Sequence, residues 1–259
     1  MDIELAKKVA IEAVKEAGKV LLDNIESVEV VAFKAKSDIV TKIDLQSEKI
    51  VIGLIKASFP DHAILSEEAG FLGKHSSEYL WIMDPIDGTI NYYHGMNPFR
   101  VGLCLLKDKQ PILTVVYNPT KDDLYFAEKG KGATLNGQPM KVSDTDDLNN
   151  SVVMTHLSSK KESRVRTIVA LENIFTKSMQ MRMFGSGLAA MCYIASGRFD
   201  VFFNIKTNPW DILPGVLLIE EAGGKVTDIN GEKITEESTS IVASNGKVHD
   251  QILKLLETI

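Results

Sequence analysis

The alternation of apolar and polar positions divides the first part of the chain into two long helices and short strands. Apolar residues recur with a helical period over residues 3–25 and again over residues 42–58, and Pro60 lies just beyond the second run. Apolar runs at 63–65 and 79–83 are typical of short buried strands. We therefore expect two helices packed against the start of a sheet.

The pattern changes after residue 99. Residues 99–127 alternate in the manner of strands, and Asn136-Gly137 is typical of a hairpin turn. The polar segment 143–150 is followed by alternating elements. We expect strands at 152–156, 179–184, 200–203, 225–227 and 240–243, and helices at 164–175, 211–222 and 247–256, with another helix opening at Gly185-Ser186. This order favours a layered α+β or α/β fold, a single domain with subdomains of about 1–147 and 148–259.

Composition narrows the class of protein. Of 259 residues, 44% are hydrophobic and 25% charged, as in ordinary soluble globular proteins, and the net charge of −6 argues against nucleic acid or a membrane as the main partner. No apolar run approaches the roughly 18 residues of a membrane span, and the N-terminal helix lacks the apolar core of a signal peptide. Cys104 and Cys192 are far apart, which favours two reduced core thiols. We expect a cytoplasmic protein.

Carboxylates mark the ends of the expected buried strands. Asp84 and Asp87 follow one apolar run and Glu67 follows another, while Asp44 and Asp211 stand at the starts of expected helices. Each alone also fits a turn or a helix cap. Gathered in one cleft of low dielectric constant, they would repel each other by several kcal/mol unless a cation bound them.

The residue types indicate which cation and which chemistry. Oxygen ligands without His or Cys select hard ions such as Mg²⁺, Mn²⁺ or Ca²⁺. A carboxylate shared by two such ions is typical of metal-assisted phosphoryl hydrolysis. Gly88 and Thr89 open a short helix whose N–H groups can bind phosphate oxygens. The Thr89 hydroxyl can orient a water, and Asp44 or Glu67 is the candidate proton acceptor.

Four blocks together resemble the inositol monophosphatase family: "DIVTKID" at 38–44, "EE" at 67–68, "DPIDGT" at 84–89 and "WDILPGVLLIEEAGG" at 210–224. Members are Mg²⁺-dependent, lithium-sensitive phosphomonoesterases. The resemblance implies a sugar-phosphatase-like fold of alternating α-β-α-β-α layers, usually a homodimer. It also implies hydrolysis of a small-molecule phosphate ester, inositol 1-phosphate or a similar polyol phosphate, by direct attack of a metal-activated water.

The resemblance further implies a role for each matching residue. Glu67, Asp84 and the carbonyl of Ile86 would bind one metal, and Asp84, Asp87 and Asp211 a second, with a third, weaker ion on Glu67. Asp44 and Thr89 would deprotonate and aim the water, assisted by Glu67. The substrate would be bound by Asp87, Gly88, Thr89, Gly185, Ser186, Gly187, Asn204 and Asp211.

One departure leaves the substrate open. Inositol-specific members commonly carry a glutamate seven residues before the Trp-Asp aspartate, and Asn204 stands there in this chain, with Lys206 nearby. The alternative is the same chemistry on fructose 1,6-bisphosphate, 3′-phosphoadenosine 5′-phosphate or the 2′-phosphate of NADP. A different class is a non-catalytic regulator that keeps the fold. The five histidines are scattered without metal-ligand spacing, and we expect structural roles for them.

Overall fold

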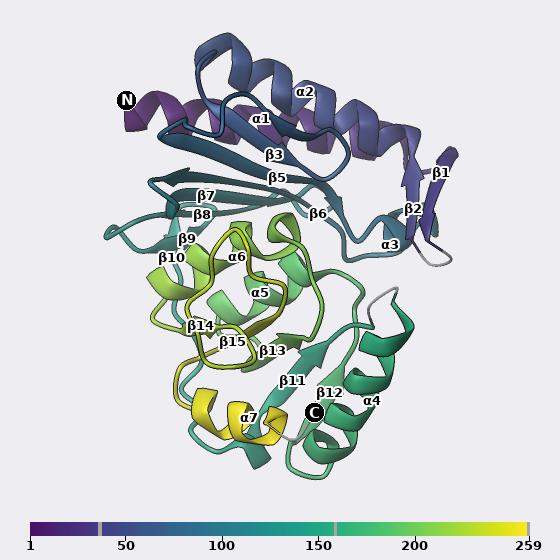
Figure 1. Cartoon of the computed structure of the whole chain (residues 1–259), viewed down its shortest axis with the longest axis vertical. Coiled ribbons are helices and arrows are strands. Elements are labelled where there is room, and N and C mark those ends of the chain that lie inside the picture. Colours follow the sequence, from purple (N-terminus) through teal and green to yellow (C-terminus); the bar gives the residue numbers. More distant parts are fainter. Residues whose placement is uncertain (36–37, 158–159, 258–259) are drawn as a thin grey trace.

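The computed structural model describes residues 1–35, 38–157 and 160–257, which form five stacked layers (Figure 1). Helices α1 and α2 cover an eight-stranded sheet, α5 and α6 lie beneath it, and a five-stranded sheet follows, with α4 and α7 on its outer face. The α-β-α-β-α order confirms the predicted fold class. No helix within the described ranges is long and apolar enough to cross a membrane.

The helices agree closely with the apolar periodicity. They are α1 (Ile3–Asn24), α2 (Lys42–Ser58), α3 (Thr89–Tyr93), α4 (Lys161–Phe175), α5 (Gly187–Ala195), α6 (Pro209–Glu221) and α7 (His249–Leu256), with a 3₁₀ turn, η1 (Leu148–Asn150). The buried face of α1 is built largely from alanine and valine, so the helix lies close to α2 and to the sheet.

The first sheet has the strand order β10-β9-β8-β7-β6-β5-β3-β4. Its strands are β3 (Ala63–Ser66), β4 (Gly70–Leu72), β5 (Tyr79–Asp87), β6 (Arg100–Lys107), β7 (Gln110–Asn118), β8 (Asp123–Glu128), β9 (Ala133–Leu135) and β10 (Gln138–Pro139). Only β3 and β5 pair in parallel among these described strands. Asn136 and Gly137 join β9 to β10 with positive φ angles of 49° and 79°, which confirms the predicted hairpin turn.

The second sheet has the order β12-β11-β13-β15-β14. Its strands are β11 (Val152–Thr155), β12 (Gln180–Arg182), β13 (Val201–Asn204), β14 (Lys225–Thr227) and β15 (Ile241–Ser244), and a separate hairpin joins β1 (Val30–Ala35) to β2 (Asp38–Thr41). The chain thus passes from one large sheet to the other between β10 and β11. The subdomain boundary at 147/148 stays a prediction.

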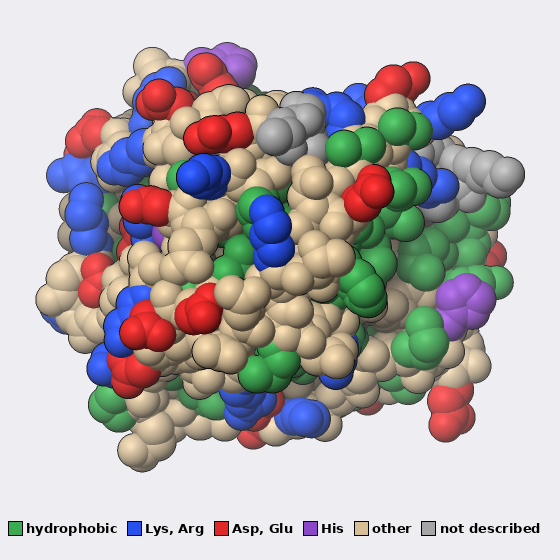
Figure 2. All heavy atoms as spheres, turned by 90° about the horizontal axis from the view of Figure 1, so that it is seen from below, with side chains coloured by type: hydrophobic (Ala, Val, Ile, Leu, Met, Phe, Trp, Pro, Cys, Tyr) green, Lys and Arg blue, Asp and Glu red, His purple; other side chains and the backbone are tan. Residues whose placement is uncertain are grey.

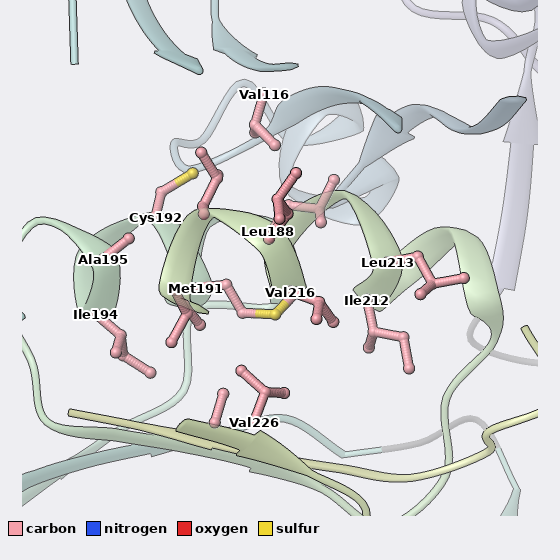
Figure 3. Close-up of a cluster of buried hydrophobic side chains, with 14 of the residues drawn as sticks. Val116, Leu188, Met191, Cys192, Ile194, Ala195, Ile212, Leu213, Val216 and Val226 are labelled. Carbon is pink, nitrogen blue, oxygen red and sulfur yellow. The ribbon is translucent and has the colours of Figure 1, made fainter. Parts of the chain in front are cut away.

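The middle layer is the largest buried apolar cluster. In Figure 3, Leu188 and Met191 of α5 and Val216 of α6 lie between Val116 of the upper sheet and Val226 of the lower one. The layer packs tightly, since a Cβ atom on Gly215 would lie 2.3 Å from Met191 Cε. This packing fixes the N-terminal ends of α5 and α6.

Near the predicted site residues, three element boundaries differ from those that the sequence predicts. Strand β5 continues through Asp87 instead of ending at Met83, with an irregularity between Asp84 and Asp87. Helix α6 begins at Pro209, so Asp211 lies in its first turn. Helix α5 begins at Gly187, with Ser186 as its N-cap. In each case a polar side chain bonds to backbone N–H groups, an interaction that apolar periodicity does not report.

The two cysteines lie in the core, and charged and hydrophobic side chains gather on different parts of the surface. Cys104 and Cys192 are free and buried, as predicted. Figure 2 shows charged side chains of both signs on one part of the lower face and hydrophobic side chains gathered on another. Helix α4 exposes several large apolar side chains, Phe175 most of all at 71%. The homodimer stays a prediction.

Candidate active site

The end of β5 positions the central motif. Gly88 follows it with a φ of +89° and turns the chain into α3. A Cβ atom at this position would lie 3.0 Å from the Pro98 carbonyl oxygen, so the turn requires glycine both for its backbone angle and for its space. Asp84 Oδ1 accepts a hydrogen bond from Ile86 N at 3.0 Å, which holds the strand end in shape.

Asp87 joins the end of β5, in the first sheet, to the start of α5 in the middle helical layer. Its carboxylate accepts from Gly187 N at 3.0 Å, from Leu188 N at 2.8 Å and from the Ser186 hydroxyl. Burial raises the pKa of Asp87 to about 6, and these hydrogen bonds oppose the rise. The predicted residues Asp87, Ser186 and Gly187 are therefore brought into direct contact.

Asp44 forms a capping box at the start of α2 and also bonds to Thr89. Its Oδ2 accepts from the backbone N–H of Thr41 at 2.8 Å and from the Thr41 hydroxyl, while its Oδ1 lies 3.1 Å from Thr89 Oγ1. Thr89 Oγ1 also lies 2.9 Å from the carbonyl oxygen of Ile86. Burial raises the pKa of Asp44 to about 6. The predicted catalytic pair is thus in hydrogen-bond contact.

Asp211 occupies the equivalent position in α6. Its Oδ2 accepts from Asn208 N at 2.8 Å, from Asn208 Nδ2 at 3.1 Å and from Thr207 Oγ1 at 3.1 Å. The capping box explains how an acid is held at the start of this otherwise apolar helix.

Glu67 lies after β3 and is paired with a lysine that our sequence reasoning did not place in the site. Lys34 Nζ, on β1, is 2.9 Å from Glu67 Oε1 and 2.6 Å from Glu68 Oε1. Burial favours a lower pKa for Lys34, but the attraction of the two carboxylates outweighs it and raises the pKa. Burial and the charge of Asp211 raise the pKa of Glu67, against the opposing effect of Lys34.

The buried carboxylates repel one another across the layers. The pKa of Asp84 lies well above its usual value because the side chain is buried and because Glu67, Asp87 and Asp211 add negative charge. Within the described ranges, no three acidic, histidine or cysteine side chains lie in an arrangement that would hold a metal as they stand. Instead, hydrogen-bond donors of the protein bind these carboxylates, and the Lys34 ammonium group forms an ion pair with Glu67. This all-oxygen, mutually repelling donor set fits a hard divalent cation.

A cavity of about 160 Å³ opens at this point. Its lining consists of Ile39, Asp87, Gly88, Thr89, Ile90, His156, Gly185 and Asp211. Five predicted site residues thus meet at one surface, although they come from positions more than 120 residues apart. The other predicted residues lie outside the lining; they are Asp44, Glu67, Asp84, Ile86, Ser186, Gly187 and Asn204.

His156 is a cavity residue that our sequence reasoning assigned a structural role. Its Nε2 is 2.5 Å from Asn204 Nδ2, and Asn204 Oδ1 accepts from Lys206 N at 3.3 Å. The amide therefore presents its N–H group to Nε2, so the ring proton of neutral His156 lies on Nδ1. Burial lowers the pKa of His156 to about 4, which keeps the ring neutral. The residues are 48 positions apart, and no sequence signal joins them.

The chain resembles known proteins over its whole length. The model of the inositol monophosphatase family matches residues 2–259. A Nus factor SuhB from Xylella fastidiosa is 32% identical over 252 residues, covering 94% of this chain and 91% of the relative. A fructose-1,6-bisphosphatase/inositol-1-monophosphatase from Thermotoga maritima is 34% identical over 257 residues, covering 99% and 94%.

Solved structures share the fold. The extragenic suppressor protein suhB from Bartonella henselae superposes with a TM-score of 0.92 at 29% identity, covering 97% of this chain and 98% of that one. An IMPase/NADP phosphatase complexed with Mg²⁺ and phosphate superposes with a TM-score of 0.87 at 25% identity, covering 99% and 96%. These likenesses support the layered fold described above.

Proposed function

Because the chain belongs to the inositol monophosphatase family, we propose that it is a Mg²⁺-dependent phosphomonoesterase acting on inositol 1-phosphate or a similar polyol phosphate. One observation carries the proposal. Asp87 and Asp211, from different layers, line one cavity together with Gly88 and Thr89, the residues suited to bind a phosphate. The family and the named relatives support phosphatase activity, and the ester is our own inference.

The metal ligands follow from the acidic residues. Glu67, Asp84 and the Ile86 carbonyl would hold one ion, and Asp84, Asp87 and Asp211 another, with a third on Glu67. Mg²⁺, or Mn²⁺ in its place, would neutralise the carboxylates and stabilise charge on the transferring phosphoryl group. The Mg²⁺-containing relative supports this choice of ion.

Asp44 and Thr89 would move the proton of the attacking water. The Thr89 hydroxyl donates to Asp44 Oδ1 at 3.1 Å, so its oxygen can accept a proton from water while its own proton passes to Asp44. The water oxygen would then attack phosphorus as the ester P–O bond breaks, the leaving alkoxide oxygen would take a proton from a solvent water, and Asp44 would return its proton to solvent. The free N–H groups at the start of α3 would hold the phosphate oxygens meanwhile.

His156, which lines the cavity, and Asn204, which contacts it from behind, favour a neutral alcohol over a second phosphate. His156 and Asn204 are both uncharged and hydrogen-bonded to each other. Lys206, which motivated the bisphosphate alternative, lines a separate cavity with Asp228 and Glu232. Neutral donors and acceptors match the hydroxyl groups of a polyol.

A phosphate-release panel tests the proposal. With Mg²⁺, kcat/KM should be highest for inositol 1-phosphate and at least about tenfold lower for fructose 1,6-bisphosphate and for NADP. Activity should be lost in EDTA, and added Li⁺ should inhibit it. His156→Phe should lower kcat/KM for inositol 1-phosphate while leaving p-nitrophenyl phosphate hydrolysis nearly unchanged. Equal rates on all three natural esters would contradict the substrate assignment.

The Nus factor relative suggests a second candidate function, association with a macromolecular partner. The retained acidic set favours hydrolysis over a purely non-catalytic role, because a binding protein has no need of repelling buried carboxylates. Failure of the pure protein to release phosphate from any ester with Mg²⁺ would reverse this preference.

A further inference from the structure

Another cavity, of about 230 Å³ and distinct from the one lined by Lys206, shares no lining residue with the candidate active site. It lies where the segment before β6, the end of β7 and the region around α5 meet. Its lining consists of Asn97, Pro98, Arg100, Asn118, Lys121, Phe184 and Tyr193. The proposed reaction makes no use of this lining.

Arg100 is the unusual residue of this cavity. Its side chain is 1% exposed, yet no carboxylate of the described residues lies within 4.0 Å of its guanidinium group. Nη1 donates to the Phe99 carbonyl oxygen at 2.7 Å, and the guanidinium group also bonds to the Cys192 thiol and lies 5.9 Å from the Tyr193 ring centroid. Nε has no protein partner in the described part of the chain. A buried guanidinium stays charged, so it is unfavourable unless an anion accompanies it.

Other donors surround the same cavity. Lys121 adds a second positive charge and makes no ion pair with the residues that the structure describes. The side-chain oxygens of Asn97 and Asn118 both lie within 3.0 Å of Thr120 Oγ1, which leaves their amide N–H groups as the remaining donors. Asn118 Nδ2 is 3.4 Å from Asp123 Oδ2, so one carboxylate contacts the lining.

We propose that this cavity binds a small tetrahedral oxyanion such as inorganic phosphate or sulfate, with Arg100 as its principal ligand and Lys121 as a second. Arginine suits this role because its planar donor set matches the oxygens of phosphate or sulfate. The site differs in principle from the active site, where the acidic residues would repel phosphate until divalent cations are bound. Anion binding at Arg100 therefore needs no metal.

Metal-free conditions separate the two sites. We would titrate inorganic phosphate into the full chain in EDTA, by calorimetry, at ionic strength held constant with chloride. We expect about one phosphate per chain, bound at least about tenfold more weakly by Arg100→Met and less strongly affected by Lys121→Met. Asp211→Asn should bind phosphate as the wild type does. Failure of the phosphatase assay would leave these results unchanged, so the two proposals stand or fall separately.

Thermal unfolding gives a second readout. Without oxyanions, Arg100→Met should melt at or above the wild-type Tm, because it removes a buried charge. Phosphate in EDTA should then raise the Tm of the wild type and not that of Arg100→Met. Phosphate binding that appears only with Mg²⁺, or that Arg100→Met retains, would overturn the proposal. If Arg100→Met did not fold, unchanged phosphate affinity of Lys121→Met would overturn it too.

Discussion

Helices α2 and α6 carry the same local motif near the candidate active-site cavity, and the surroundings of the two copies differ. Each has an aspartate, Asp44 or Asp211, in its first turn, bonded back to the N-cap residue. Asp44 is 1% exposed and its second oxygen contacts Thr89. Asp211 is partly exposed and lines the cavity, where a ligand can contact it.

The difference teaches how a stabilising motif can serve chemistry. A capping box uses one carboxylate oxygen and fixes the side chain's rotamer. At Asp44 the second carboxylate oxygen contacts the hydroxyl of Thr89, which lines the cavity, so the group would suit proton transfer. Where the surroundings include further carboxylates, as at Asp211, it suits a metal. Under the proposed function, the burial and the neighbouring groups at each helix start, not the capping motif, would set the role of the carboxylate.

Removing the charge of Asp211 should have the largest effect. Asp211→Asn keeps an oxygen for the cap, so the fold should hold, but the second metal would lose a ligand. We expect kcat/KM to fall by about three orders of magnitude or more, since metal charge supplies several kcal/mol of transition-state stabilisation. Steady-state phosphate release with Mg²⁺, alongside circular dichroism, measures both. A folded variant at the wild-type rate would refute the ligand assignment.

Changing Asp44 should act on proton transfer instead. Asp44→Asn should lower kcat by about 10²-fold to 10⁴-fold with little change in Mg²⁺ affinity. Its pH–rate profile should lose the acidic limb that the wild type shows. Thr89→Val should reproduce the loss. A variant that binds Mg²⁺ much more weakly would show that Asp44 is a metal ligand and erase the contrast with Asp211.

The stability of the metal-free protein should fall as pH rises from 6 to 8.5. Burial raises the pKa of Glu67 to about 8 and that of Asp44 to about 6 in the folded chain, so the folded state binds protons that the unfolded state has released. That proton excess stabilises the fold at low pH and disappears as pH passes these values. Mg²⁺ should flatten the dependence. Differential scanning calorimetry in EDTA and in Mg²⁺ measures it, and a Tm rising with pH in EDTA would contradict us.

The smallest effect should come from the caps themselves. Thr41→Ala and Asn208→Ala each remove one capping partner, and each should cost about 0.5–2 kcal/mol, or roughly 2–4 °C of Tm per kcal/mol. Thr41→Ala should also lower kcat, because it frees the Asp44 carboxylate to rotate. If both variants lost the same fraction of kcat, the effect of the cap on catalysis would not be specific to Asp44.

Much of the fold and part of the site could be predicted from the sequence. The apolar period located α2 at residues 42–58, because a helix covering a sheet must repeat its buried face. The motif around Asp84 and Asp87 predicts metal chemistry, and that assignment stays a prediction. The contacts made by Lys34 and His156 could not be predicted, because each depends on a partner more than 30 residues away that only the folded layers bring near.

The burial of α5 and α6 between two sheets has a consequence for how this protein can diversify. The residues that these helices present to the cavity, such as Asp211, cannot shift without disturbing both sheets. The part of the cavity where we propose that phosphate binds is therefore constrained by the stability of the whole molecule. His156 also lines the cavity, but it lies on the segment after β11 and contacts Asn204 of β13, outside the helices of the middle layer. New ester preferences should therefore arise there first, through substitutions that leave the hydrolytic groups untouched.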